Sequence, residues 1–382
     1  MTNFKRLGDI ATYINGYAFK PEDRGNEGLP IIRIQDLTGN SYDLGFYNGK
    51  YPKRIEINNG DVLISWSGSL GVYHWNKGKA LLNQHIFKVV FDKSEIDKSY
   101  FIYAIQHYLK EMETKAHGAT MKHITKKDFD NMLVPYPNMQ RQYEIAGILG
   151  MVDSIIVFCQ QELTKLDELV KSRFVEMFGE PVSNTFGWEQ LLLCNVTSKI
   201  GSGATPKGGK ESYQTEGITL IRSMNVHDGR FEYKDLAHIT DEQATQLNNV
   251  TVQENDVFIN ITGASVARSC IVPSSVLPAR VNQHVAIIRC VPERLNAVFA
   301  NNMFLNDRFK GQLLDIGESG GATRQAITKQ QLENLTVIVP PLELQNRFAA
   351  FVAEVDKSKL AVKQSLEKLE TLKKSLMQQY FG

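Results

Sequence analysis

The sequence contains little cysteine. Four of its 382 residues are cysteines, and Cys159, Cys194, Cys270 and Cys290 form no C-x-x-C pair and have no histidine at a metal-ligand spacing. Disulfide-stabilised folds and zinc sites depend on such spacings. We therefore expect no disulfide framework and no metal site, and four reduced thiols that are mostly buried.

Long hydrophobic runs are also missing. No window approaches eighteen consecutive apolar residues, the length from which a membrane-spanning helix is considered. The first ten residues, MTNFKRLGDI, lack the apolar core of a signal peptide. We therefore expect no membrane association and a cytoplasmic location.

The chain has no excess of charge of either sign. Lys and Arg number 43 and Asp and Glu 42, which leaves a formal net charge of +1, and no segment reads as a basic arm. The hydrophobic content of 42% is ordinary for a globular protein, and the length suffices for two or three domains. If the chain binds nucleic acid, the charge that neutralises phosphates has to be clustered locally or supplied by another subunit.

What the sequence does contain is a long internal repeat. Residues 118–179 align with residues 321–382 at an offset of 203 without a gap, and 22 of the 62 positions are identical. Both copies begin with Gly-Ala-Thr and end with Phe-Gly. A gapless repeat of this length indicates a rigid element.

The second half of each copy has the pattern of a long helix with one apolar seam, because its apolar residues follow a three-four spacing. In the first copy the seam consists of Leu149, Val152, Ile156, Cys159, Leu163, Leu166, Val170, Arg173 and Met177. The second copy places Lys359 and Lys373 on the seam, where their aliphatic stems can still cover apolar surface. Asn138 is expected to cap the first helix, and Pro341 suits the first turn of the second. We expect the two helices, each about 40 residues and roughly 60 Å long, to pair as an antiparallel coiled coil.

The segments before the two helices match more loosely. Residues 4–7 align with 188–191, and Asn83-Gln84-His85 aligns with Asn282-Gln283-His284, while the offset drifts from 184 to 203. Insertions between matched strands produce such a drift, so the two copies are expected to share a scaffold and to differ in their loops.

The predicted fold class is α+β, with two β-rich domains separated by two long antiparallel helices and related by an internal pseudo-twofold repeat. Short β-branched runs alternate with turn-rich stretches in each β-rich part, and an amphipathic helix follows them. We place the domains at 1–138 and 182–340, and the long helices at 139–181 and 341–382.

Several segments resemble one protein family, and the resemblance covers the whole chain. They are GYAFKPED, LPIIRIQDL, GDVLISWSGSLG, ALLNQHIFKV, GATMKHITKKDFDNMLVPYP, IGSGATPKGG and EKLETLKKSLMQQYFG. Their order and duplication are similar to those of the DNA-specificity subunit of Type I restriction-modification systems.

The resemblance implies a function and a set of partners. Each β-rich domain would be a target-recognition domain that reads one half of a split sequence in double-stranded DNA, while the helices set the gap. Two methyltransferase subunits would dock on the helices, and restriction/translocase subunits would complete the complex. This chain would catalyse nothing and hold no cofactor or metal, whereas its partners would use S-adenosylmethionine, ATP and Mg2+.

Catalytic motifs were weighed against this interpretation. LDIGESGG near residue 317 resembles a turn that binds S-adenosylmethionine but follows a helix instead of a strand, and ATPKGGKE near residue 207 lacks two essential positions of a phosphate-binding loop. Three alternatives stay open: the specificity subunit of a related methylation-based defence system, a stand-alone DNA-modifying enzyme, and a coiled-coil adaptor that binds protein only.

Candidate DNA-contacting residues follow from side-chain chemistry and loop position. Arg and Lys suit guanine edges and phosphates, Asn suits adenine, and aromatic residues pack against sugar or thymine methyl groups. The candidates are Lys20, Arg24, Lys53, Arg54, Tyr73, His74, Lys77, Thr120 and Lys122 in the first half, and Lys207, Lys210, Asn225, Arg230, Tyr233, Arg268, Arg280, Thr323 and Arg324 in the second. Arg33 and Arg222 occupy matched positions in apolar strands, so a buried structural pairing is expected for both. Matched residues are expected to position the DNA and unmatched residues to specify its sequence.

Overall fold

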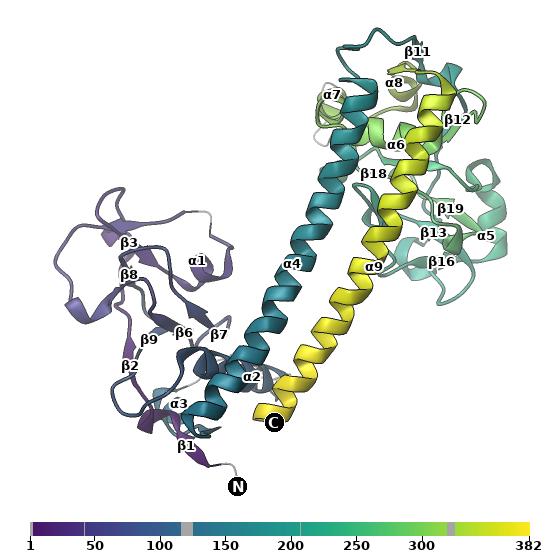
Figure 1. Cartoon of the computed structure of the whole chain (residues 1–382). Helices are drawn as coiled ribbons and strands as arrows, with labels where there is room; N and C mark the ends of the chain where they lie inside the picture. The colour runs from purple at the N-terminus through teal and green to yellow at the C-terminus, as the bar shows by residue number, and fades with distance from the viewer. Residues whose placement is uncertain (1–2, 42, 116–124, 207, 319–324) are drawn as a thin grey trace. The chain divides into compact units, whose positions relative to one another are not determined.

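The structure is a computed structural model that describes residues 3–41, 43–115, 125–206, 208–318 and 325–382 (Figure 1). The chain divides into two compact units. Unit 1 comprises Met1–Gln160 with Gln364–Gly382, and unit 2 comprises Gln161–Lys363. Each unit therefore contains one β-rich part and a section of each of the two long helices.

Unit 1 contains two four-stranded sheets, in the orders β2-β9-β6-β7 and β4-β3-β8-β5, and a two-stranded sheet β1-β10. Its strands are β1 (Phe4–Arg6), β2 (Thr12–Asn15), β3 (Leu29–Ile32), β4 (Phe46–Tyr47), β5 (Glu56–Ile57), β6 (Val62–Ser65), β7 (Gly71–His74), β8 (Ala80–Leu82), β9 (Ile86–Val90) and β10 (Leu133–Pro135). Its shorter helices are α1 (Ile34–Thr38), α2 (Lys98–Lys115) and α3 (Lys126–Asp130), with 3-10 turns η1 (Leu7–Asp9), η2 (Pro21–Asp23) and η3 (Lys53–Ile55).

Unit 2 contains sheets in the orders β12-β20-β17-β18 and β16-β13-β19, and two-stranded sheets β14-β15 and β11-β21. Its strands are β11 (Gln190–Leu192), β12 (Thr197–Ser202), β13 (Ile218–Ile221), β14 (Val226–His227), β15 (Arg230–Phe231), β16 (Ala237–Ile239), β17 (Val257–Asn260), β18 (Ser269–Ile271), β19 (Ala279–Val281), β20 (Val285–Cys290) and β21 (Thr336–Ile338). Its shorter helices are α5 (Asp241–Gln246), α6 (Ala297–Leu305), α7 (Asp307–Glu318) and α8 (Lys329–Glu333), with 3-10 turns η4 (Leu193–Asn195), η5 (Gly209–Ser212), η6 (Ser223–Asn225), η7 (Asn248–Val250), η8 (Gly263–Ser265) and η9 (Ser274–Val276).

The two units repeat one topology. The sheet β2-β9-β6-β7 corresponds to β12-β20-β17-β18, and the parallel pair β3-β8 corresponds to the parallel pair β13-β19. In both units the first strand pairs with the strand that precedes a long helix: β1 pairs with β10, and β11 pairs with β21. The predicted α+β architecture, with two repeated β-rich parts and two long helices, is confirmed.

The alignment of the two N-terminal strands is corrected by two residues. Phe4 pairs with Pro135 and Gln190 pairs with Ile338, so Phe4 corresponds to Gln190 and not to Trp188. The buried Leu7 and Leu193 then match, and each donates its backbone N–H to a carbonyl just before the last strand. The aromatic rings of Phe4 and Trp188 had suggested the other offset, whereas backbone pairing decides the register.

The amphipathic helix after each sheet differs between the units. In unit 1 it is the single helix α2, whereas in unit 2 it is divided into α6 and α7. The break occurs at Asn306, whose φ of −59° and ψ of 134° end α6, and whose Oδ1 accepts a 3.1 Å hydrogen bond from the backbone of Arg308. Asparagine readily takes this capping role, so one residue ends one helix and starts the next.

The long helices are α4 (Met139–Phe178) and α9 (Leu342–Phe381), each of 40 residues (Figure 1). Asn138 caps α4 as predicted, because its Oδ1 accepts a 2.9 Å hydrogen bond from the backbone N–H of Arg141. Pro341 immediately precedes α9, and its carbonyl accepts a 2.9 Å hydrogen bond from the backbone N–H of Leu344. The long helices were placed at 139–181 and 341–382, whereas α4 ends at Phe178 and α9 spans Leu342–Phe381.

The two helices run antiparallel and use the predicted seam. In unit 1 Lys373 Nζ lies 2.5 Å from Asp153 Oδ1, and in unit 2 Lys359 Nζ lies 2.6 Å from Asp167 Oδ1. The higher-numbered lysine thus meets the lower-numbered aspartate, as antiparallel pairing requires. The seam lysines pair with carboxylates of the other helix, which keeps their charges compensated where their side chains are partly buried.

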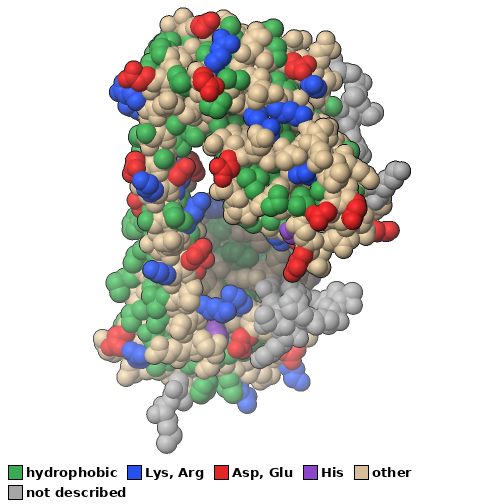
Figure 2. All heavy atoms as spheres, turned by 90° about the vertical axis from the view of Figure 1, so that its right-hand side faces the viewer, with side chains coloured by type: hydrophobic (Ala, Val, Ile, Leu, Met, Phe, Trp, Pro, Cys, Tyr) green, Lys and Arg blue, Asp and Glu red, His purple; other side chains and the backbone are tan. Residues whose placement is uncertain are grey.

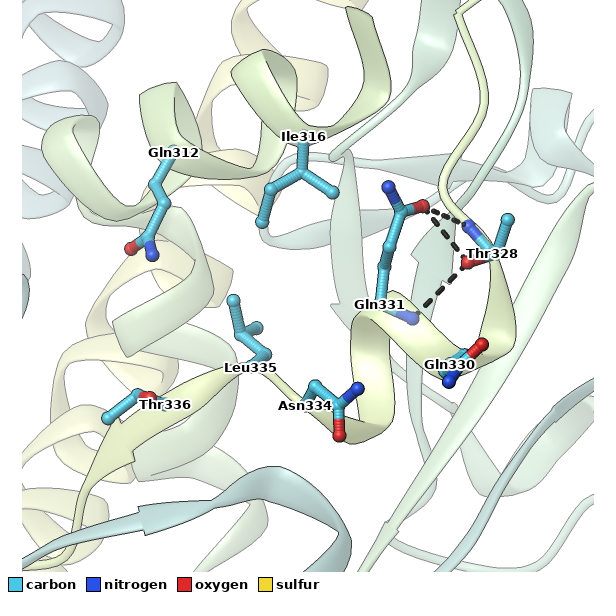
Figure 3. A pocket seen from close by; sticks show the side chains of 8 residues that line it. All are labelled: Gln312, Ile316, Thr328, Gln330, Gln331, Asn334, Leu335 and Thr336. Carbon is cyan, nitrogen blue, oxygen red and sulfur yellow. Dashed lines mark hydrogen bonds between the residues drawn. The ribbon is translucent and has the colours of Figure 1, made fainter. Parts of the chain in front are cut away.

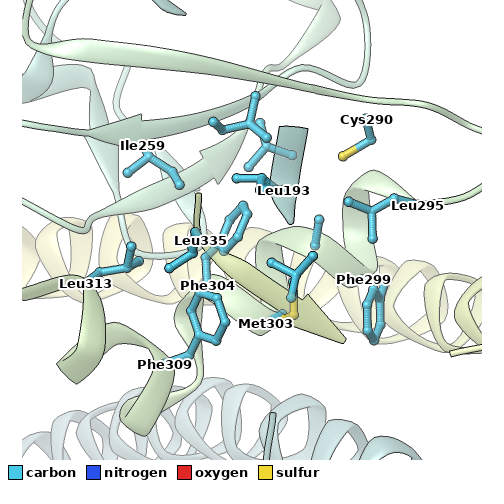
Figure 4. Packing of buried hydrophobic residues seen from close by; sticks show 14 of the residues in the cluster. Leu193, Ile259, Cys290, Leu295, Phe299, Met303, Phe304, Phe309, Leu313 and Leu335 are labelled. Carbon is cyan, nitrogen blue, oxygen red and sulfur yellow. The ribbon is translucent and has the colours of Figure 1, made fainter. Parts of the chain in front are cut away.

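The core of unit 2 joins its sheet to the ends of the long helices. Phe178 of α4 is fully buried, and its ring lies 4.7 Å from that of Phe299 in α6 and 5.6 Å from that of Phe348 in α9. Figure 4 shows Phe299 beside Leu295. Met303 of the same cluster lies below Ile259 of β17 in this view. In unit 1 the corresponding ring of Phe381 lies 5.4 Å from Tyr100 of α2.

Candidate nucleic-acid interface

The described candidates of unit 1 lie in turns and at strand ends. Lys20 and Arg24 flank η2, Lys53 and Arg54 belong to η3, and the backbone turn after β7 carries Lys77. All five are exposed. Lys20 Nζ lies 3.8 Å from Glu22 on the surface, and such exposed pairs hold a side chain weakly, so the ammonium remains available to a phosphate.

Two further candidates of unit 1 are at the end of β7. Tyr73 is half-buried and packs against the sheet residues of unit 1, whereas His74 is exposed at the end of the strand. Tyr73 pairs with Leu63 and His74 with Val62 of β6. Successive side chains of a strand point to opposite faces of its sheet, so Tyr73 and His74 lie on different faces of the sheet and would not contact DNA together.

The hairpin β14-β15 of unit 2 brings together side chains that carry nitrogen donors. Its register pairs His227 with Arg230, and Arg268 Nη1 lies 3.5 Å from His227 Nδ1. Arg230 is exposed and lies 3.6 Å from Glu232. A two-stranded ribbon fits the major groove, and Arg is the commonest reader of guanine there. This group, His227, Arg230 and Arg268, is called the hairpin cluster below.

The sequence analysis missed His227 of the hairpin cluster. A signal for it existed, because His227 directly precedes Asp228-Gly229, a dipeptide typical of hairpin turns. Tyr233, also a candidate, follows β15 with 53% of its surface exposed, and its hydroxyl lies 3.3 Å from Ser275 Oγ.

Two candidates of unit 2 are structural in this conformation. Asn225 is fully buried, and its Nδ2 donates a 3.0 Å hydrogen bond to the carbonyl of Glu232. Arg280 is 9% exposed and donates to the carbonyls of Ala244 and Ala279, at 3.1 Å and 3.0 Å. Their donors are used inside the unit, which argues against a base contact by either side chain.

Arg33 and Arg222 have matched structural roles, but each is half-buried and lies just after its strand, not inside it. Arg33 Nε lies 3.3 Å from Asp36 Oδ2, with the two side chains 13% and 6% exposed. Arg222 donates to the carbonyl of Asp235 and lies over the ring of Tyr213, 5.5 Å from its centroid. Each arginine ends an inner strand and holds the following loop.

Several candidates lie outside the described residues: Thr120, Lys122, Lys207, Thr323 and Arg324. Lys210 belongs to η5, but its side chain is outside the described part of the chain. The duplicated Gly-Ala-Thr turn is therefore still a prediction as a phosphate contact.

Charges of both signs are mixed over the surface. On the face that Figure 2 draws, basic and acidic side chains of the described residues alternate and do not gather into one broad patch of either sign. This agrees with the balanced totals of 43 basic and 42 acidic residues. Phosphate neutralisation by this chain alone is accordingly limited.

A pocket of about 340 Å3 lies in unit 2 between α7, α8 and β21 (Figure 3). It is lined by Gln312, Ile316, Thr328, Gln330, Gln331, Asn334, Leu335 and Thr336. Gln331 and Thr328 form a capping box, in which Gln331 Oε1 accepts a 2.8 Å hydrogen bond from the backbone of Thr328. The lining offers amides and hydroxyls and no charged group, so it is unsuited to hold a phosphate.

The cysteines and acidic residues give no sign of a metal centre. Within the described ranges, no group of three or more His, Cys, Asp or Glu side chains is arranged to hold a metal ion. Cys270 and Cys290 are buried, Cys159 is half-buried and Cys194 is exposed, and all four are free. The expectation of mostly buried thiols is therefore wrong for Cys194.

The helix α4 carries more apolar surface than its seam uses. By length and composition α4 could cross a membrane. Only 22% of its most apolar 18-residue window is buried, so most of that window is exposed. Exposed apolar residues recur at matched positions of the two helices: Val157 matches Leu360, and Leu169 matches Leu372. Each unit contains one residue of each pair, so exposed apolar positions recur in both units.

Comparison with known proteins places the chain in a family. Residues 2–168 and 188–372 match the family model described as Type I restriction modification DNA specificity domain. The chain is 25% identical over 411 residues to the Type I restriction enzyme EcoBI specificity subunit of Escherichia coli, an alignment that covers 98% of this chain and 84% of that protein. It is 22% identical to the Type I restriction enzyme MjaVIII specificity subunit of Methanocaldococcus jannaschii, over 97% of this chain and 90% of that one.

Solved structures share the fold. The S subunit of a Type I restriction-modification system from M. genitalium superposes with a TM-score of 0.56 at 15% identity, covering 100% of this chain and 96% of that chain. A chain from a study of complex assembly and conformational transition of the type I R-M system gives a TM-score of 0.57 at 18% identity, over 99% and 97%. Two matched regions, two repeated units and these relatives lead to one conclusion: the chain belongs to the Type I restriction-modification DNA specificity family.

Proposed function

We propose that this chain is the subunit that selects the DNA sequence, with each β-rich part reading one half of a split target. The observation that carries the proposal is the repeated scaffold with unmatched polar residues, of which Arg230 is exposed. Arg33 and Arg222 are matched and hold loops, whereas the hairpin cluster has no counterpart of the same residues in unit 1. Shared residues position the protein, and residues that differ can read different bases.

The long helices hold the two β-rich parts and fix the unread gap between the half-sites. Support comes from the continuous 40-residue lengths of α4 and α9 and from the ion pairs Asp153–Lys373 and Asp167–Lys359 along their seam. Two paired helices resist bending more than a single helix does, so they suit a fixed separation between the two β-rich parts.

Two methyltransferase subunits dock on the helices. The matched exposed residues Val157 and Leu360, and likewise Leu169 and Leu372, support two docking surfaces of related design. Catalysis is carried out by those subunits, which use S-adenosylmethionine, and by restriction/translocase subunits, which use ATP and Mg2+. This chain contributes recognition and assembly and holds no cofactor of its own.

Binding to DNA tests the proposal. Because the net charge is +1 and the hairpin cluster contains only two arginines, the isolated chain is expected to bind DNA weakly and to gain affinity when methyltransferase subunits join. A gel-shift titration at one salt concentration, with and without the methyltransferase, measures the gain. Equal affinity in both, or no preference for the methylated target of the host, would contradict the proposal.

A further inference from the structure

We infer that the two units dock their methyltransferase copies with unequal affinity, because unit 1 has an apolar patch on α4 whose counterpart on α9 in unit 2 is polar. The inference rests on the proposed docking of two copies and adds that the first copy binds to unit 1. The α4 patch consists of Met151, Ile155 and Phe158.

The α4 patch is exposed although its residues are large and apolar. Met151 is 61% exposed, Ile155 46% and Phe158 65%. Spacings of four and three residues place the three side chains on one face of the helix. Each patch residue directly precedes a seam residue, as Met151 precedes Val152, which is 7% exposed, so the patch lies about 100° around α4 from the seam and flanks it.

The repeat supplies an internal comparison. At the offset of 203, Met151, Ile155 and Phe158 correspond to Glu354, Ser358 and Ala361 of α9. Glu354 forms an ion pair with Lys357 at 2.6 Å, and both side chains are more than 70% exposed. The same helix face thus carries three large apolar side chains in unit 1, whereas in unit 2 it carries a charged side chain, a hydroxyl and a methyl group.

The occupant of the α4 patch is a helix face of the methyltransferase subunit. Val157 with Leu360 and Leu169 with Leu372 stay apolar and exposed in both helices, which is what a partner that binds twice through equivalent contacts requires. Two identical copies bring the same surface to both units. An apolar surface gains from covering the α4 patch, whereas over the Glu354–Lys357 pair it removes water from two charges.

The expected difference between the two binding steps is about 30-fold, equal to about 2 kcal/mol at 1.4 kcal/mol per tenfold. Three apolar side chains, each roughly half-exposed, bury enough surface to supply it. Assembly then proceeds through an intermediate with one methyltransferase copy, bound to unit 1.

In the test, the full-length chain is titrated with the methyltransferase subunit. Native mass spectrometry counts the subunits bound at each concentration. We expect two dissociation constants that differ about 30-fold after statistical correction. The variant Met151→Glu/Ile155→Ser/Phe158→Ala, which gives α4 the residues of α9, should weaken the first step to the level of the second. The reciprocal variant Glu354→Met/Ser358→Ile/Ala361→Phe should strengthen the second step.

Each outcome has one meaning. Equal steps in the unaltered chain, or steps that the α4 variant leaves unchanged, overturn the inference and leave the proposed function standing. If no methyltransferase subunit binds at all, the proposed function fails first. Dimers of the bare chain, or its flotation with phosphatidylglycerol vesicles, that the α4 variant abolishes would assign the patch to another occupant and overturn the inference. Thermal unfolding of both variants checks folding, which exposed substitutions should leave intact.

Discussion

At the scale of single residues, burial separates four chemically identical thiols. Burial raises the pKa of Cys270 and Cys290 to about 12, whereas Cys194 is exposed. Because a raised pKa lowers the thiolate fraction at any given pH, these two thiols should be almost unreactive at pH 8. We expect Ellman's reagent to label Cys194 fastest, Cys159 more slowly, and Cys270 and Cys290 only in denaturant. Cys194→Ser should remove the fast phase, and a fast phase that persists in this variant would contradict the assignment.

At the scale of an element, the contribution of each α4 side chain to stability depends on whether that side chain is buried. Phe178 is fully buried among Phe174, Phe299 and Phe348, whereas Phe158 on the same helix is 65% exposed. Phe178→Ala should lower the free energy of unfolding by about 3–5 kcal/mol, because it leaves a cavity. Phe158→Ala is the matched control and should change it by less than about 0.5 kcal/mol. Urea denaturation, monitored by circular dichroism, measures both changes. Similar losses of unfolding free energy in the two variants would refute this packing.

The pairing of the two helices gives a second prediction at this scale. Asp167 and Lys359 mark one level of the seam, so four residues inserted after Leu166 and four after Lys359 lengthen both helices together. Each insertion adds about 6 Å at 1.5 Å per residue and rotates the seam only slightly. The unread gap should lengthen by up to about two base pairs at 3.4 Å per step, with both half-sites unchanged.

Mapping of methylated bases in cells that carry the double insertion measures this gap. An insertion after Leu166 alone is the control, because it shifts α4 against α9 and should reduce methylation. An active double-insertion variant with an unchanged gap would show that the helices do not set the spacing.

At the scale of the whole molecule, the repeat predicts modular reading. Exchanging residues 182–320 for the same region of a relative replaces strands β11 to β20 of unit 2 and leaves β21 and the long helices in place. One half of the methylated target should change and the other should stay. Methylation mapping of the chimera reads out both halves at once, and a change in both half-sites would argue against independent recognition.

The sequence by itself determined the repeat, the two long helices and the fold class. The three-four spacing around Leu149 and Val152 and the gapless offset of 203 are properties of order along the chain, and a helix follows from local order. For the same reason the cap at Asn138 was predictable, since a cap involves neighbours only.

Only the tertiary structure decided which candidates face solvent and how distant strands align. Arg268 and Arg280 look alike in sequence, yet one joins the hairpin cluster and the other gives its donors to Ala244 and Ala279. The offset between β1 and β11, and the exposure of Phe158 beside a buried seam, likewise depend on partners far along the chain. Burial and strand register are set by contacts between remote segments, and the order of residues within one segment does not contain them.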